Sequence, residues 1–219
     1  MRPRPQKLMR RYEDDGSVRF LTFSCYRRLP LLRNDRIKDR FAAHLARATQ
    51  PPDVRLIAWV VMPDHVHLLL QPNHVDAPSG ATASLQCRTR TDSDHCKDAV
   101  APDAVAPDAA TSRKPRSITR VLYDLKRPFA RDVIARWREL DAPVLRRITD
   151  KRGRPHFWQS GGGYDRNLRT AAEINEKIDY IHANPPRRAL CRFEQDWPWS
   201  SIHAYDGVPY VGPRIDPPL

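Results

Sequence analysis

The sequence shows no long apolar run, no apolar segment directly after its basic N-terminus and no cysteine cluster, three features that define several common classes of protein. No stretch of its 219 residues approaches the ~18 consecutive apolar residues that a helix needs to cross a bilayer. The N-terminus, Met1–Lys7, is basic, and no apolar segment follows it, so we expect no secretory signal. The cysteines form no Cys-x-x-Cys pair, which favours a reduced chain without a zinc cluster. They are Cys25, Cys87, Cys96 and Cys191.

Acidic residues are in deficit. The 26 Asp and Glu stand against 38 Lys and Arg, so the formal net charge is +12. Such an excess favours a polyanionic partner, with nucleic acid ahead of an anionic membrane surface. We therefore expect a nucleic acid as the partner, no membrane association, and a cytoplasmic, nucleoid-associated location.

The composition changes between residues 72 and 116, where Ala, Pro and Asp dominate and an imperfect Ala-Val-Ala-Pro-Asp repeat occurs. This segment has few large apolar residues and no sustained periodicity, so we predict a flexible insertion. It interrupts a domain predicted for 17–205, which lies between a basic N-terminal arm (1–16) and a C-terminal tail (206–219). Four candidate metal-binding residues in the insertion show no recognised spacing: His74, Cys87, His95 and Cys96.

Hydrophobic patterning predicts a chain that mixes strands and helices in the order βαββαβα. Runs rich in β-branched and aromatic residues predict strands at 18–27, 54–62, 65–71 and 155–159. Apolar residues spaced three and four apart predict helices at 35–48, 118–140 and 170–184.

Helix boundaries have their own signals. Ser117 is a good N-cap, and Thr170 with Glu173 forms a capping box. Pro128 should kink or divide the second helix, and Pro185 should end the third.

His65 and His67 stand at the start of the third predicted strand, directly after Met62-Pro-Asp64. On a strand, residues i and i+2 point to the same face, so the two imidazoles should project side by side. That arrangement is suited to holding one metal ion between their nitrogens. The alternative is a strand edge at which two histidines meet solvent.

Tyr180 lies away from the apolar stripe of the third predicted helix, on a polar side shared with Glu173, Lys177 and Asn184. A tyrosine with an amide one turn later is the arrangement expected of a nucleophile beside a metal ligand. The alternative is an ordinary exposed tyrosine on an amphipathic surface helix.

Five motifs in a fixed order resemble the single-tyrosine HUH transposases, and within them the REP-associated tyrosine transposase (RAYT) branch. The resemblance covers roughly 15–205 without the insertion. The motifs are Met62-Pro-Asp-His65-Val-His67-Leu-Leu-Leu70, Phe157-Trp-Gln159, Tyr164-Asp-Arg-Asn167, Tyr180-Ile-His-Ala-Asn-Pro185 and Trp197-Pro-Trp-Ser-Ser201.

The resemblance implies an α+β fold with a ferredoxin-like or RRM-like antiparallel sheet, helices packed on one face, and the catalytic tyrosine on a C-terminal helix. It also implies that His65 and His67 are metal ligands, that Tyr180 is the nucleophile, and that Asn184 is the third ligand. The expected ion is Mg²⁺ or Mn²⁺, and imidazole ligands fit Mn²⁺ somewhat better.

The implied activity is cleavage and strand transfer of single-stranded or hairpin DNA, such as REP-like repeats, through a 5′-phosphotyrosine. Lys177 is a candidate to lower the pKa of the tyrosine or to neutralise the phosphate.

Aromatic residues offer stacking surfaces: Trp158, Tyr164, Trp197 and Trp199, although we expect the last two to pack over the core. Basic residues are expected to contact phosphates: Arg127, Arg152, Arg154, Arg166, Arg169, Arg187 and Arg188.

Two other functions fit parts of the pattern. A binding protein on the same scaffold would recognise hairpin DNA or structured RNA without cutting it. A metal-dependent hydrolase of small molecules would need further ligands, typically on a barrel of ~250 residues, for which this chain is too short. The sequence leaves open whether the protein is a monomer or a homodimer.

Overall fold

The computed structural model describes residues 16–50, 54–72, 116–161, 163–210 and 212–218. The predicted basic arm and insertion lie almost wholly outside these ranges, as do the four candidate metal-binding residues of the insertion. The predicted domain boundaries therefore stay a prediction.

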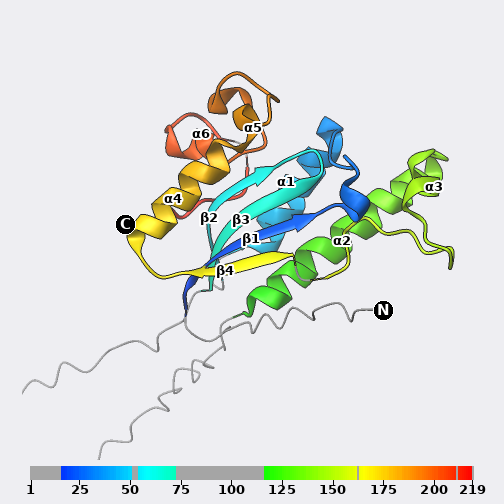
Figure 1. Ribbon diagram of the computed structural model, residues 1–219, viewed down its shortest axis with the longest axis horizontal. Helices are drawn as coiled ribbons and strands as arrows, with labels where there is room; N and C mark the ends of the chain where they lie inside the picture. Colours follow the sequence, from blue (N-terminus) through cyan, green and yellow to red (C-terminus); the bar gives the residue numbers. More distant parts are fainter. Residues whose placement is uncertain (1–15, 51–53, 73–115, 162, 211, 219) are drawn as a thin grey trace, which may run out of the picture.

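The centre of the fold is a four-stranded sheet with the strand order β2-β3-β1-β4 (Figure 1). Its strands are β1 (Val18–Ser24), β2 (Val54–Val61), β3 (His65–Pro72) and β4 (Tyr164–Leu168). Every neighbouring pair is antiparallel, and β1 lies between β3 and β4. The expected α+β fold with an antiparallel sheet is confirmed.

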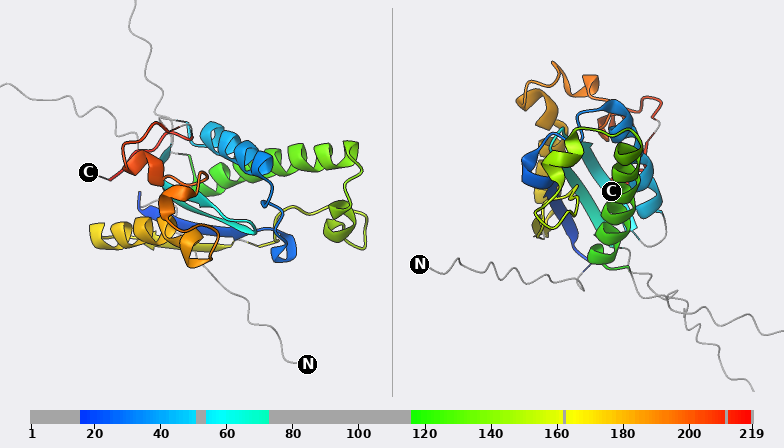
Figure 2. Two further views of the ribbon diagram at one scale, coloured as in Figure 1. Left: turned by 90° about the horizontal axis from the view of Figure 1, so that it is seen from above. Right: turned by 90° about the vertical axis from the view of Figure 1, so that its right-hand side faces the viewer.

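Two helices cover one face of this sheet, as expected. They are α1 (Asp35–Ala48) and α2 (Ile118–Glu139), which also pack against each other (Figure 2). Phe41 of α1 and Phe129 of α2 meet edge to face with ring centroids 5.2 Å apart. Their apolar stripes bury Leu21 and Trp59 of the sheet. Pro128 does not divide α2, which continues through it as one helix.

A third helix, α4 (Ala171–His182), lies on the opposite face, against β2 and β3 (Figure 2). This placement differs from the expectation that the helices share one face. The reason is that this second face is also apolar: Ile178 and Ile181 of α4 are buried with Phe20 and Leu69 of the sheet.

The capping box of Thr170 and Glu173 begins α4 as predicted. The helix ends at His182, two residues earlier than expected, and the short α5 (Asn184–Arg187) follows with two prolines in its first turn.

The fourth strand is not the one predicted. Residues 155–159 form only isolated bridges, including one between Trp158 and Cys25, while β4 forms at Tyr164–Leu168. That segment reads Tyr-Asp-Arg-Asn-Leu and buries only Leu168 fully, because it is an edge strand with little apolar cover. Because this segment is mostly polar, the pattern of apolar runs did not predict it as a strand.

The outer edge of β2 is covered by the C-terminal part of the chain. The amide of Val61 donates to the carbonyl of Trp199, that of Ser201 to Trp59, and that of Asp216 to Leu56. The Trp197 indole donates to the Val61 carbonyl at 3.0 Å, and its side chain is buried, which confirms that Trp197 packs over the core.

The remaining α-helices are short: α3 (Val144–Ile148) and α6 (Ile202–Tyr205).

Within the part of the chain that the structure describes, no helix is long and apolar enough to span a membrane.

A buried ion pair ties β4 to the sheet. The Arg19 guanidinium of β1 binds both carboxylate oxygens of Asp165 on β4, at 2.9 and 2.7 Å. Both side chains are almost fully buried, at 3% and 2% exposure. The pair therefore holds the strand that carries Tyr164 in its register.

Removing one partner of this ion pair should destabilise the folded protein. We expect Asp165→Ala to lower the free energy of unfolding, measured by urea denaturation, by about 3–5 kcal/mol because the buried Arg19 charge loses the carboxylate that binds it through two hydrogen bonds. The double variant Arg19→Met, Asp165→Leu replaces both charges with apolar groups and should be clearly more stable than the single variant. Equal losses in the two variants would contradict this explanation.

Candidate active site

One cavity of about 380 Å³ opens where the second face of the sheet meets α4. It combines residues from β1, β3, β4 and α4 with one residue that follows β1 and one that follows α5. Its lining is Phe20, Thr22, Ser24, Arg28, His65, His67, Tyr164, Lys177, Tyr180 and Arg188. Five of these residues, His65, His67, Lys177, Tyr180 and Arg188, are candidate site residues from the sequence.

The two histidines converge as strand periodicity predicts. Their Nε2 atoms lie 3.1 Å apart, and the side chains are buried. The Asp64 carboxylate lies 2.6 Å from His65 Nδ1, and the Thr22 hydroxyl lies 2.7 Å from His67 Nδ1. A carboxylate can only accept, so His65 carries its proton on Nδ1, and the Nε2 atom offers a lone pair.

Both imidazoles are held in the neutral form. Burial lowers the pKa of His65, although the neighbouring Asp64 opposes that shift. Burial, with smaller electrostatic contributions from His65 and Arg188, lowers the pKa of His67 to about 3. Neutral histidine is the form that ligates a metal ion.

The histidine pair fits a divalent ion. Two nitrogen lone pairs directed at the same space repel unless a cation or proton lies between them. Adjacent ligands of an octahedral ion with bonds of about 2.1 Å lie about 3.0 Å apart, close to the 3.1 Å between the two Nε2 atoms. Partners on the outer ring nitrogens are also typical of metal-binding histidines. Among the described residues, no group of three or more His, Cys, Asp or Glu side chains is placed to hold an ion.

Tyr180 lies directly beside this pair rather than on an open surface. Its ring meets His67 edge to face, with centroids 5.5 Å apart, and meets Phe20 in the same way at 5.8 Å. The Lys177 ammonium lies 5.6 Å from the centroid of the Tyr180 ring and also binds Glu176 at 2.6 Å. A phenol, a cation and two imidazoles therefore share one cavity.

Asn184 occupies a different position. Its side chain is buried, and its amide nitrogen donates to the backbone carbonyl of Tyr180 at 2.7 Å. It does not line the cavity in this structure. Its role as a third metal ligand stays a prediction.

Two of the predicted phosphate-binding arginines lie at the site. Arg188 lines the cavity, and the guanidinium of Arg187 lies 5.9 Å from the centroid of the Tyr180 ring. The short α5 that follows Tyr180 places both of them there.

The other five predicted arginines do not line the cavity. Arg166 pairs with Glu173, and the Arg169 amide donates to the same carboxylate. Arg152 and Arg154 belong to the turn around Asp150 and line a separate cavity with Tyr26 and His156. Arg127 lies on α2, on the other side of the sheet, against Tyr123. Contacts between these residues and DNA stay predictions.

The aromatic residues differ in their exposure. The Trp158 indole donates to the Lys126 carbonyl at 3.0 Å, and its ring packs on Phe23 and Phe129 within the core. Tyr164 is 48% exposed and lines the cavity. Of these two, Tyr164 has the more accessible ring.

Several residues that line the cavity were not predicted from the sequence. Phe20, Thr22 and Ser24 alternate along β1, and the register places Thr22 opposite His67 and Ser24 opposite His65. The alternation along β1 shows in the sequence that these three side chains share a face. The sequence does not show that β1 pairs with β3, which carries the histidines. Arg28 follows β1 and had no local signal at all.

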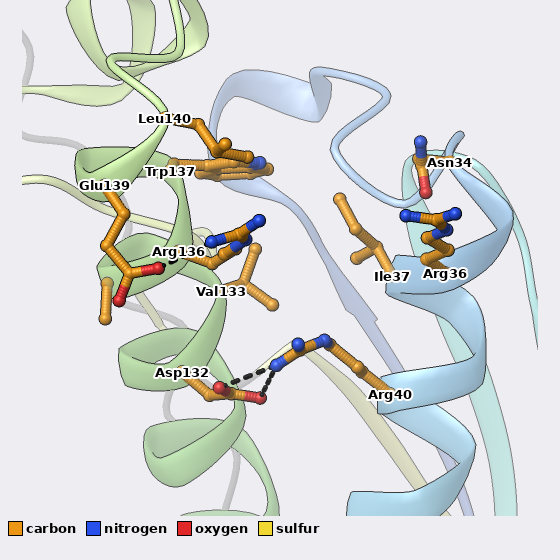
Figure 3. Close-up of a pocket in the computed structure, with 11 residues that line it drawn as sticks. Asn34, Arg36, Ile37, Arg40, Asp132, Val133, Arg136, Trp137, Glu139 and Leu140 are labelled. Carbon is orange, nitrogen blue, oxygen red and sulfur yellow. Dashed lines mark hydrogen bonds and ion pairs between the residues drawn. The ribbon is translucent and has the colours of Figure 1, made fainter.

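Another cavity, of about 530 Å³, lies between α1 and α2 on the far side of the sheet (Figure 3). The Arg40 guanidinium spans it and binds both oxygens of Asp132 at 2.8 Å. Arg136 is likewise paired, with Glu139. Two of its arginines are therefore neutralised by carboxylates, and no histidine pair or tyrosine lines the cavity.

The sequence comparisons agree with the geometry. Residues 15–91 match the family model described as "Transposase IS200 like". A comparison with curated protein sequences finds no match.

Two solved structures are similar to the chain. One is the structure of the REP-associated tyrosine transposase bound to a REP hairpin, with 18% identity and a TM-score of 0.54, covering 96% of this chain and 92% of that chain. The other is a candidate transposase from Deinococcus radiodurans R1, with 18% identity and a TM-score of 0.34, covering 75% of this chain and 89% of that chain.

The chain is thus similar to the IS200-like transposases over residues 15–91. Over almost its whole length it has the fold of the REP-associated tyrosine transposase. The resemblance expected from the five motifs is confirmed.

Proposed function

We propose that the protein is a metal-dependent DNA strand transferase that cleaves single-stranded or hairpin DNA through a 5′-phosphotyrosine intermediate on Tyr180. The observation that carries this proposal is the meeting of the Tyr180 ring with the His65–His67 pair in one cavity. Strands β1, β3 and β4 and helix α4, which are distant from one another in sequence, supply the cavity.

The chemistry follows from the groups present. The Tyr180 hydroxyl attacks the phosphorus, a new phosphorus–oxygen bond forms, and the bond to the 3′-oxygen breaks. The phenolic proton is lost, and the departing 3′-oxygen takes up a proton, so no co-reactant is consumed. Because the phosphotyrosine keeps the energy of the phosphodiester, a 3′-hydroxyl can reverse the step and rejoin the strand.

His65 and His67 are the residues that would hold Mg²⁺ or Mn²⁺, with Asn184 as a third candidate. A bound ion would supply Lewis-acid polarisation of a phosphate oxygen. The outer nitrogens of both histidines are already bonded, which keeps the rings from rotating out of position.

The substrate must be a strand whose backbone can enter the cavity. A phosphate locked in a duplex is less accessible to a half-buried tyrosine, which favours single strands or the foot of a hairpin. The REP hairpin is the ligand of the REP-associated structure, and we extend that class of ligand to this chain. Arg187 and Arg188 lie where they would contact the strand, with an affinity that falls steeply with salt.

The first test is the covalent adduct. Wild-type protein incubated with labelled hairpin oligonucleotides from repeats near its gene, with Mn²⁺ or Mg²⁺, should give a 5′-linked protein–DNA band on a denaturing gel. Tyr180→Phe should abolish that band, since it removes the nucleophilic oxygen.

Tyr180→Phe is also a clean control for folding. The ring makes the contacts with Phe20 and His67, so the melting temperature should stay close to that of the wild type. Binding without any adduct would contradict the proposal and favour a non-cleaving nucleic-acid-binding protein.

Lys177 is proposed to stabilise the phosphate charge or the tyrosinate. Lys177→Met should slow adduct formation at least about tenfold, because a preorganised cation beside the reacting phosphate is lost. The matched variant Glu176→Gln removes only the ion-pair partner of Lys177. An unchanged rate in Lys177→Met would remove this residue from the mechanism.

The Thr22 hydroxyl should matter for metal binding although it is not a ligand. Thr22→Val keeps the shape of the side chain and deletes the partner of His67 Nδ1. The affinity for Mn²⁺, measured by isothermal titration calorimetry, should fall by about 10–100-fold. Thr149→Val, which deletes a hydroxyl bonded to the Leu145 carbonyl, is the control and should leave the affinity unchanged. Equal affinities for Thr22→Val and wild type would count against this role.

A further inference from the structure

A second cavity adjoins the candidate active site. It has a volume of about 390 Å³ and shares Thr22, Ser24, Arg28 and Tyr164 with the first. Its remaining lining comes from Phe23, Gln159, Ser160, Gly161 and Gly163. Because these four residues line both cavities, the cavities lie next to each other across the end of β1, and together they are called the groove.

The far wall of this groove is fixed by a close backbone approach. Gly163 has φ +67°, and a Cβ there would collide with the Thr22 carbonyl. The Gln159 amide also donates to the Ser24 carbonyl at 2.9 Å. Gln159 and Gly163 are therefore both held close against the backbone of β1.

Arg28 stands where the two cavities join, in a backbone conformation that arginine rarely adopts. Arg27 and Arg28 both have φ of 53°, in the left-handed region. Hydrogen bonds hold this turn: the Arg27 amide donates to the Gln159 side chain, and the Arg28 amide to the Cys25 carbonyl. Left-handed residues other than glycine that persist in this way are concentrated at functional sites.

The charge on Arg28 has no carboxylate partner among the described residues. Arginines that do form ion pairs with carboxylates in the described ranges are Arg19, Arg40, Arg116, Arg120, Arg136, Arg166 and Arg214. Arg28 and Arg188 both line the active-site cavity and are absent from the ion pairs found in the described ranges. An anion that enters the groove therefore meets two free guanidinium groups.

On the basis of the proposed function, we infer that Arg28 binds the phosphate next to the scissile one, and that the second cavity receives the flanking nucleotide against Tyr164. A strand seated at Tyr180 must leave the first cavity, and the second cavity lies next to it at Arg28. The exposed Tyr164 ring offers a stacking surface for a base.

The test compares Arg28→Asn with Arg27→Asn. Asparagine tolerates the left-handed region and carries no charge, so both variants should fold with melting temperatures near that of the wild type. The Arg27 side chain lies over the Tyr26 ring and lines the cavity at the Asp150 turn instead. We expect adduct formation to fall at least tenfold in Arg28→Asn, to recover partly in Arg28→Lys, and to stay within twofold of wild type in Arg27→Asn.

Neutral methylphosphonate groups, placed one at a time on either side of the scissile phosphate, locate the contact. A methylphosphonate at one flanking position should slow adduct formation by the wild type at least tenfold. The same substitution should not slow adduct formation by Arg28→Asn any further. Should Arg28→Asn misfold, Arg28→Gly allows the same comparison.

The outcomes separate this inference from the proposed function. If the wild type forms the Tyr180 adduct while Arg28→Asn is unaffected, or if every methylphosphonate slows Arg28→Asn as it slows wild type, the Arg28 contact is wrong and the proposed function stands. If the wild type forms no adduct with any substrate, both fail.

Discussion

The pairing of β1 with β3 is the constraint on which the site depends. It places Thr22 opposite His67 and Ser24 opposite His65, so the side chains that orient and surround the histidines come from a neighbouring strand. A shift of one residue would turn Thr22 towards the core and lose that support. The same register sets Phe20 beneath His67 and Tyr180, which links the position of the α4 helix to the sheet.

What the sequence could predict was mostly local. The period of two along β3 predicted that His65 and His67 share a face, and the capping box predicted where α4 begins. The stripes of α1 and α2 were equally clear, because each helix buries one continuous apolar face. The role of Tyr180 needed the resemblance as well, since its spacing alone also fits an exposed surface tyrosine.

What could not be predicted depends on long-range pairing. Thr22 is separated from His67 by 45 positions, and no local pattern indicates that they meet. The β4 strand was missed because its edge position leaves it polar, while the apolar segment around Trp158 looked more like a strand and instead packs as a loop. Arg28 depends on a left-handed turn that only the surrounding hydrogen bonds specify.

The two edges of the sheet differ in a way that bears on local opening. β2 has hydrogen-bonding partners on both sides, since Trp199, Ser201 and Asp216 occupy its outer edge. The sheet can open from the β2 side only after the C-terminal segment has detached. The amide protons of β3, including those of the two histidines, should therefore exchange slowly. β4 is short and open to solvent, and it carries Tyr164. The amide protons at the β4 edge should therefore exchange faster than those of β3, while the Arg19–Asp165 pair keeps β4 in register.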